Sequence, residues 1–176
     1  MSTFRQLVPP NTGVQTGAGW CLAFTQAVYS APVMHATAKI ASQHVTRWND
    51  SRVMPNVSVP VWFDHWGTYG CVDGNFGHVL AWVPGRGFLS SPRWGYGQEW
   101  FQTLEEVERA YNGRFLFWSL DINTKLVAEN APSPAPIPPE PEPLPTPVTT
   151  RKGKKMFLCY FKDAAGKGKP RWAFFG

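Results

Sequence analysis

Hydrophobic and polar residues follow two different periods along the first 128 residues, which predicts both helices and strands in this part of the chain. The run WCLAFTQAVY at 20–29 holds helix-forming residues without Gly or Pro and follows the loop sequence TGAG, so a first helix is expected there. Apolar residues recur at helical spacing over 35–48, which predicts a second helix. A third, short helix is predicted in TLEEVERAY, because Thr103 and Glu106 have the spacing of a capping box.

Four short β-branched or aromatic runs, separated by turn-forming residues, are expected to form one small antiparallel sheet. They are VSVPVWFDH at 57–65, GHVLAWV at 77–83, GFLSS at 87–91 and GRFLFWSLDIN at 113–123. The turn PGRG at 84–87 predicts a hairpin between the second and the third run. The order helix, helix, strands, helix, strand predicts an α+β domain with its N-terminal helices packed on the sheet.

A proline-rich segment divides the chain. Nine of the 17 prolines lie between Pro132 and Pro147, where the fixed φ and the missing N–H of proline exclude helix and sheet. An extended polyproline II spacer is expected there, and an SH3-type ligand is the alternative interpretation. We therefore predict a domain at 1–128, a linker at 129–150 and a tail at 151–176.

Charge is distributed unevenly between these parts. Eight of the 17 basic residues but one of the 12 acidic residues lie after residue 150, which leaves 9 and 11 for the rest of the chain. A tail of this charge suggests an anionic partner. The tail mixes its basic residues with aromatic ones and is expected to form one hairpin that is too small to fold alone.

Cysteine usage and the N-terminal sequence favour a cytosolic origin. Cys21, Cys71 and Cys159 are widely spaced and include no C-x-x-C pair, so they predict neither a disulfide framework nor a zinc site. The N-terminal residues lack the basic and apolar regions of a secretory signal, and no apolar stretch of about 18 residues occurs. We expect a soluble protein without a cofactor or a membrane span.

Cys21 and His78 are candidates for a nucleophile and its base. The thiolate is the reactive form of cysteine, and the pKa of a thiol falls at a helix N-terminus beside a histidine, where Cys21 is expected. His78 opens a predicted strand, which could hold an imidazole rigidly. Ser90 or Ser91 on the neighbouring strand could orient the ring, with Asp64 as a rival. The alternative is that Cys21 is a small apolar residue that packs at a helix start.

Other histidines and aromatic residues allow further interpretations. His35 and His44 lie nine positions apart on the predicted second helix, so they are expected to face different directions. His65 with His78 could mimic a two-histidine metal site, although no third ligand follows a known spacing. The segment SPRWGYGQEWF at 91–101 is expected either to line a groove for sugar or peptide, or to be a surface loop fixed to the core by its rings.

In their order and spacing these features resemble the CHAP and NlpC-type cysteine amidases and peptidases that cut bacterial cell-wall peptides. The similarity covers residues 11–125 and rests on the short motifs GWC, VTRWND, PVWF, GHV, FLSSPRWGYG and RFLFWSLDIN. It implies a papain-like fold and hydrolysis of an amide bond without metal, with Cys21 as nucleophile, His78 as base and Ser91 as third residue. The family commonly has Glu, Asp or Asn at the third position, whereas serine carries no charge to stabilise an imidazolium.

The resemblance predicts a phage-type peptidoglycan hydrolase, either an endolysin or a lysin carried on the virion. Stem peptides and the lactyl amide that joins them to the glycan are both candidate substrates. The chain would be made in the cytoplasm of the host bacterium and act on the cell wall, and its tail would bind anionic wall polymers or other virion proteins. Two alternatives stay open: an inactive structural or attachment protein with the same fold, and a nucleic-acid-binding protein led by its tail.

Overall fold

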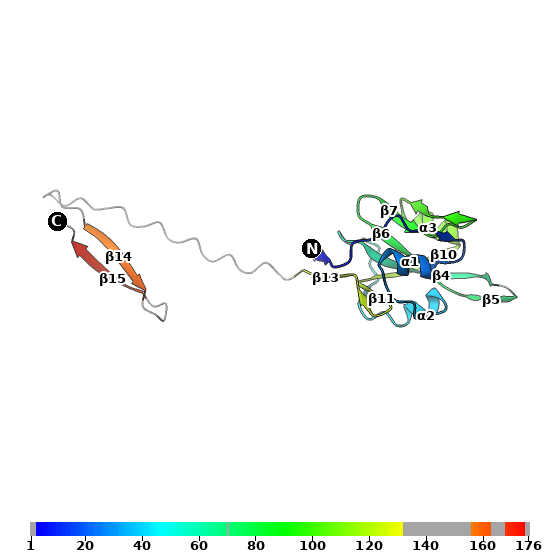
Figure 1. Cartoon of the computed structure of the whole chain (residues 1–176), viewed down its shortest axis with the longest axis horizontal. Coiled ribbons are helices and arrows are strands. Elements are labelled where there is room, and N and C mark those ends of the chain that lie inside the picture. The colour runs from blue at the N-terminus through cyan, green and yellow to red at the C-terminus, as the bar shows by residue number, and fades with distance from the viewer. Residues whose placement is uncertain (1–2, 70, 132–155, 163–167, 175–176) are drawn as a thin grey trace. The chain divides into compact units, whose positions relative to one another are not determined.

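A computed structural model describes residues 3–69, 71–131, 156–162 and 168–174 of the chain (Figure 1). The chain divides into two compact units, Met1–Pro132 and Ser133–Gly176. In the second unit, β14 (Met156–Lys162) pairs antiparallel with β15 (Gly168–Phe174). The proline-rich residues 132–150 lie outside the described part of the chain.

A seven-stranded antiparallel sheet dominates the first unit. Its strands, in spatial order, are β3 (Trp48–Asn49), β10 (Gly113–Ser119), β4 (Val59–Tyr69), β6 (His78–Val83), β7 (Gly87–Ser90) and β9 (Glu99–Phe101), with β5 (Val72–Asn75) paired to the far end of β4. The β4–β5 ribbon extends from the body of the unit (Figure 1).

Three helices and three two-stranded ladders complete the described residues of the first unit. The helices are α1 (Cys21–Val28), α2 (Ala38–Ser42) and α3 (Leu104–Tyr111). The ladders are β1 (Phe4–Gln6) with β13 (Ala128–Asn130), β2 (Thr16–Gly17) with β8 (Tyr96–Gly97), and β11 (Asp121–Ile122) with β12 (Lys125–Leu126). Strand β13 extends two residues beyond position 128, where the sequence analysis ends the domain. None of the helices in the described part of the chain is both long and apolar enough to cross a lipid bilayer.

The predicted fold class, a papain-like α+β domain with N-terminal helices on a small sheet, is wrong. The described residues form mostly β-structure, and the sheet is much larger than the four predicted strands. The additional strands β3, β5 and β9 contain two to four residues each, so they are too short to show a clear period of two in the sequence.

The predicted second helix is wrong in its extent, because only α2 forms within 35–48. The Thr37 side chain caps its start by accepting the Ile40 N–H at 3.2 Å. Beyond its end, the Asp121 carboxylate accepts the backbone N–H groups of Thr46 and Arg47, each at 3.1 Å. These N–H groups are therefore not available to a helix, and the chain continues into the edge strand β3.

Three other local predictions are confirmed, whereas the strand predicted over 113–123 ends at Ser119. Helix α1 lies within the predicted residues 20–29, and β6 and β7 form the predicted hairpin. Helix α3 begins after Thr103, whose side chain accepts the Glu106 N–H at 3.2 Å. Each of these elements depends on signals within a few residues of one another.

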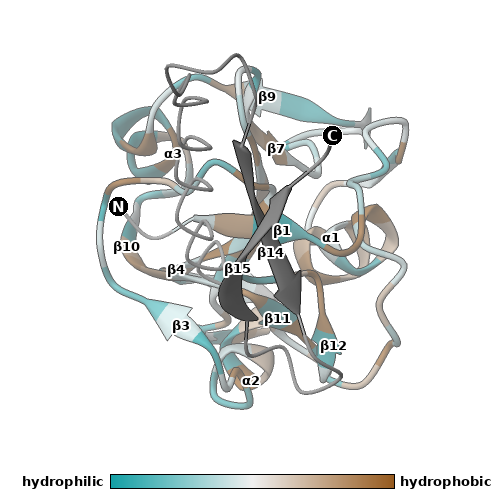
Figure 2. Cartoon of the chain, turned by 90° about the vertical axis from the view of Figure 1, so that its left-hand side faces the viewer, coloured by the Kyte–Doolittle hydropathy of each residue, from teal (hydrophilic) through white to brown (hydrophobic). Residues whose placement is uncertain are grey.

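The sheet separates two hydrophobic cores. Alternation along β6 directs Val79 and Ala81 toward α1, whereas Leu80 packs with residues of α3 on the opposite face. His78 shares the face of Leu80, which is called the α3 face below. Helix α1 is largely hydrophobic and the edge strand β3 is hydrophilic (Figure 2), in keeping with the burial of five of the eight residues of α1.

Candidate active site

Cys21 is the first residue of α1, as predicted, and its side chain is half-buried. Burial raises the pKa of the thiol and outweighs the backbone N–H groups of Val79, Leu22 and Cys21, which lower it. The prediction of a lowered pKa at this helix start is therefore wrong. Helix α1 packs directly on β6, where the Thr25 hydroxyl donates to the Val79 carbonyl at 3.2 Å. The resting side chain is a neutral thiol.

His78 begins β6 and is only 3% exposed. The preceding Gly77 has φ +67°, and a Cβ there would lie 2.6 Å from the backbone nitrogen of Lys39, so α2 approaches this turn too closely for any side chain. The imidazole stacks on the Tyr111 ring with centroids 3.7 Å apart. Burial lowers the pKa of His78 to about 3, with a smaller contribution from the charge of His65. The imidazole is neutral at neutral pH.

The structure brings Cys21 and His78 to the same end of β6. The N–H that reaches the Cys21 sulfur belongs to Val79, the residue that directly follows His78. The sulfur thus lies beside the backbone of this strand, but Cys21 packs against the core that contains Val79, whereas the imidazole extends to the α3 face. Among the hydrogen bonds of the described residues, none joins the thiol to the ring directly; the partner of the ring is Ser90.

Three hydroxyl and carbonyl groups form a chain of hydrogen bonds from the His78 ring. The Ser90 Oγ lies 3.2 Å from His78 Nε2 and 3.0 Å from the Tyr111 hydroxyl. The Tyr111 hydroxyl in turn donates to the Ser91 backbone carbonyl at 3.0 Å. Ser91, the predicted third residue, therefore contributes its carbonyl, and Ser90 makes the side-chain contact. Alternation along β7 places Ser90 with Phe88 on the α3 face, where His78 lies.

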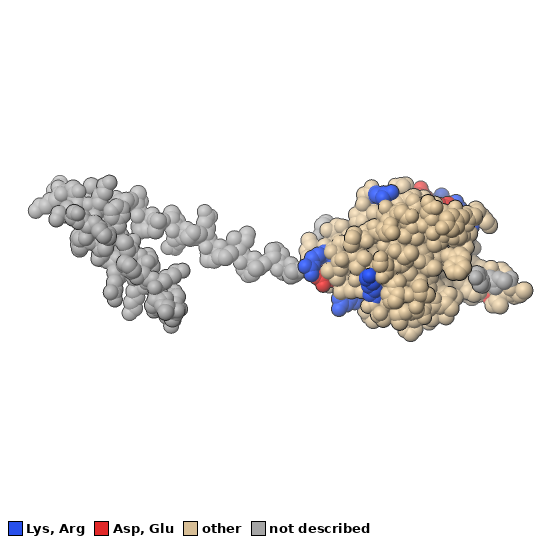
Figure 3. Space-filling view, viewed as in Figure 1, with Lys and Arg blue, Asp and Glu red and all other residues tan. Residues whose placement is uncertain are grey.

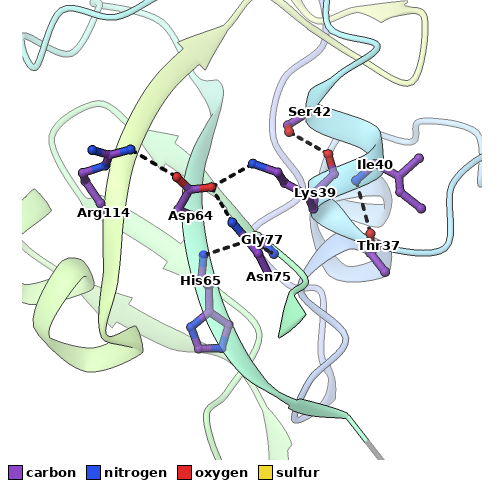
Figure 4. A network of polar contacts seen from close by, with 9 residues as sticks. All are labelled: Thr37, Lys39, Ile40, Ser42, Asp64, His65, Asn75, Gly77 and Arg114. Atoms are coloured by element: carbon purple, nitrogen blue, oxygen red, sulfur yellow. Dashed lines mark hydrogen bonds and ion pairs between the residues drawn. The ribbon is translucent and has the colours of Figure 1, made fainter. Parts of the chain in front are cut away.

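Asp64, the rival for the third position, is engaged elsewhere (Figure 4). Its carboxylate accepts from Lys39 Nζ at 2.9 Å, from Asn75 Nδ2 at 2.8 Å and from Arg114 at 3.3 Å. Burial raises the pKa of Asp64, but the hydrogen bonds from Asn75 and Lys39 outweigh it and leave the pKa below its usual value. Asn75 also accepts the Gly77 N–H at 3.0 Å, so this network holds the turn before His78.

The histidine pairs differ from the predictions. His35 and His44 stack with ring centroids 4.6 Å apart, because α2 is too short to hold them on one helix, so the prediction that they face different directions is wrong. The ring centroids of His65 and His78 lie 6.3 Å apart, and His65 Nδ1 forms a hydrogen bond with the Tyr111 carbonyl. No group of three metal-ligating side chains gathers among the described residues.

Tyr111 is the site residue that the sequence analysis missed. Its place on the apolar stripe of α3 indicates a core residue, which its ring is, but nothing in the pattern shows the role of its hydroxyl. Its partners lie 20 and 21 positions away in the chain, on another element. A tyrosine at the end of a short helix gives no local signal for such contacts.

Three aromatic side chains near Cys21 face solvent, and we call them the aromatic surface: Trp20, Trp94 and Tyr96 are 61%, 86% and 75% exposed. The β2–β8 ladder places Tyr96 opposite Gly17, and a Cβ on Gly17 would lie 3.5 Å from the Trp20 ring. Trp20 immediately precedes Cys21.

Two other aromatic residues of the segment 91–101 contact the core or its edge. Phe101 belongs to the α3-face core, and the half-buried Trp100 packs beneath the Arg86 guanidinium, 4.3 Å from its ring centroid. Trp100 and Phe101 thus fix this surface segment to the core, as one interpretation predicts, and the groove for sugar or peptide stays a prediction.

The first unit shows few charged side chains on the face seen in Figure 3. The basic side chains from Arg151 onward lie outside those that the structure describes, so the partners of the tail stay predictions. Comparisons of the chain with protein-family models, with curated proteins and with solved structures find no match in any of the three.

Proposed function

We propose that this chain is a cysteine-dependent hydrolase of the phage-lysin type that cuts an amide bond in bacterial peptidoglycan. One observation carries the proposal: the Cys21 sulfur accepts the N–H of Val79, the residue that directly follows His78, while Ser90 contacts Nε2 of the His78 ring. A nucleophile, a base and a group that orients the base are the three parts that covalent amide hydrolysis requires. The resemblance to CHAP and NlpC-type enzymes supports the choice of substrate.

The reaction starts with Cys21 as a neutral thiol and His78 as a neutral imidazole. As the Cys21 sulfur attacks the carbonyl carbon, the proton of the thiol passes to His78, and a tetrahedral intermediate forms. The oxyanion accepts from N–H groups at the start of α1, which precede the first helical bond from Phe24 N–H to the Trp20 carbonyl. The His78 imidazolium then protonates the leaving amine as the C–N bond breaks, which leaves a thioester.

The second half of the cycle restores the enzyme. His78 takes a proton from a water molecule, which attacks the thioester carbonyl. When the second tetrahedral intermediate collapses, the C–S bond breaks and the sulfur regains a proton from His78. The products are a carboxylic acid and an amine, so one water is consumed for each amide bond.

The test is digestion of purified peptidoglycan, followed by mass spectrometry of the released fragments. We expect fragments that have gained one water at an amide, with intact glycan chains. The position of the new amine distinguishes a cut within the stem peptide from a cut at the lactyl amide. Unchanged fragment masses with folded protein, across cell walls of several peptide types, would contradict the proposal.

The burial of His78 favours one second candidate, an attachment protein that keeps this fold without catalysis. A ring only 3% exposed has little surface for a leaving amine to reach. This candidate predicts that the protein binds cell walls and releases no fragments, so the same mass-spectrometric experiment separates it from a hydrolase.

We expect the aromatic surface to bind the substrate. Exposed Trp and Tyr rings offer flat apolar faces to sugars and peptides at low cost in side-chain entropy. The double variant Trp94→Ala with Tyr96→Ala should weaken sedimentation with purified cell walls about tenfold. It should leave the free energy of unfolding within about 0.5 kcal/mol of the original, because both side chains are exposed.

Trp66→Ala is the matched control, since Trp66 is 68% exposed on β4 and lies outside the aromatic surface. It should bind cell walls as the unchanged chain does. Equal binding by the double variant and this control would remove the aromatic surface from substrate recognition.

A further inference from the structure

We propose that Tyr111 and Ser90 act as positioning residues that keep the proton of the neutral His78 ring on Nε2 and so leave Nδ1 as the nitrogen that can take up a proton. The assignment rests on the proposed hydrolase for its catalytic meaning. The direction of the hydrogen bonds itself follows from the contacts alone.

The direction of these hydrogen bonds is fixed at the Ser91 carbonyl, the end of the series farthest from His78. A carbonyl oxygen can only accept, so the single hydroxyl proton of Tyr111 points to Ser91 across their 3.0 Å contact. In the 3.0 Å contact between the two hydroxyls, Tyr111 must then accept and Ser90 must donate. Because Ser90 donates its only hydroxyl proton to Tyr111, its oxygen accepts from Nε2–H in the 3.2 Å contact with His78.

A neutral imidazole carries one N–H, so the proton on Nε2 leaves a lone pair on Nδ1. Nδ1 is bonded to the ring carbon that joins the side chain, so it is the nitrogen nearer to the backbone. The Cys21 sulfur also lies near the backbone there, on the N–H of Val79. In the opposite tautomer Nδ1 would carry the N–H and could not take up a proton.

The surrounding residues hold this series of hydrogen bonds in place. Tyr111 stacks nearly parallel to the imidazole, with 24° between the ring planes, and Ser90 is fully buried. His65 Nδ1 bonds the backbone carbonyl of Tyr111 and so anchors the end of α3. The chain contains no charged group and ends on a carbonyl dipole. Its role is therefore to select a tautomer, whereas a carboxylate at the third position would also stabilise the imidazolium.

Tyr111→Phe tests the assignment, because it removes the hydroxyl and keeps the stacked ring. Without the acceptor, Ser90 is free to donate to His78 Nε2, so the Nδ1–H tautomer becomes populated. Nitrogen-15 NMR of the His78 side chain at neutral pH reports which nitrogen carries the proton, whether or not the protein is active. We expect Nε2–H alone in the original chain, a mixture in the variant, and a fall in kcat of about tenfold at unchanged KM.

Tyr29→Phe is the matched control. The Tyr29 hydroxyl is also buried and contacts a serine, Ser58, at 2.9 Å, but it lies away from the site. This variant should leave both the tautomer and kcat unchanged. Ser90→Ala removes the acceptor of Nε2–H itself and should shift the tautomer as Tyr111→Phe does, which keeps the test available if one variant does not fold.

The outcomes separate the two proposals. Nδ1–H as the resting form of the original chain, or an Nε2–H form that persists in both Tyr111→Phe and Ser90→Ala, would overturn the assignment. A tautomer shift as expected, in a protein that releases no fragments from any cell wall, would support the assignment and end the hydrolase proposal. A tautomer shift together with the kcat effect supports both.

Discussion

Replacing Cys21 with Ala should lower the rate of amide hydrolysis at least about a thousandfold, the largest effect that any single substitution is expected to have. In the proposed mechanism the sulfur forms the bond to the carbonyl carbon, and a methyl group cannot form this bond. Ala is a good helix former at the first residue of α1, so the fold should persist. The rate of fragment release from purified cell walls measures the effect, with thermal unfolding as the check on folding.

Cys71→Ala is the matched control for this substitution. Cys71 is exposed, follows the end of β4 and should be dispensable for hydrolysis. If the Cys21→Ala protein releases fragments as fast as the control does, the nucleophile is another group and the proposed mechanism fails.

Acidification below pH 6.5 should destabilise the fold through His78 by about 1.4 kcal/mol for each pH unit. The pKa of His78 falls from 6.5 to about 3 on folding, so between these values the unfolded chain binds a proton that the folded chain excludes. Stability is therefore complete above pH 6.5 and declines as the pH falls toward 3. Burial of the ring is the main cause, since a charged imidazole would lose its hydration there.

Urea unfolding of the original chain and of His78→Gln at pH 7, 6 and 5 tests this prediction. Gln removes the titration but can still donate a hydrogen bond to Ser90, which limits other losses. The difference in free energy of unfolding between the two proteins should shrink by about 2 kcal/mol from pH 7 to pH 5. A difference that stays constant with pH would show that His78 is protonated as readily in the folded chain as in the unfolded one.

Local signals predicted some elements of the fold, and distant contacts decided the others. The cap at Thr103 and the turn between β6 and β7 depend on adjacent residues, and both were predicted. The second helix was not, because Asp121, 75 positions from Thr46, takes the N–H groups that a longer helix would need. The size of the sheet was also missed, since its short strands gain their stability from pairing partners far along the chain.

The residues of the candidate site also fall into those that local signals predicted and those that distant contacts placed. The helix start at Cys21 and the strand start at His78 could be read from the pattern, because each depends on neighbouring residues. The choice between Ser90 and Ser91 depends on which face of β7 meets the ring, and a shift of one residue reverses it. Tyr111 reaches the site from the end of α3, a placement that only the packing of α3 on the sheet determines.

The protonated, half-buried state of Cys21 has a consequence for the handling of the protein. Peroxides and alkylating reagents consume thiolates, so a sulfur that holds its proton until substrate arrives is consumed slowly. Of the two cysteines whose burial the structure describes, the exposed Cys71 is the one that such reagents reach first. The chain can therefore lose a surface thiol to oxidation during storage and keep the thiol that is the proposed nucleophile.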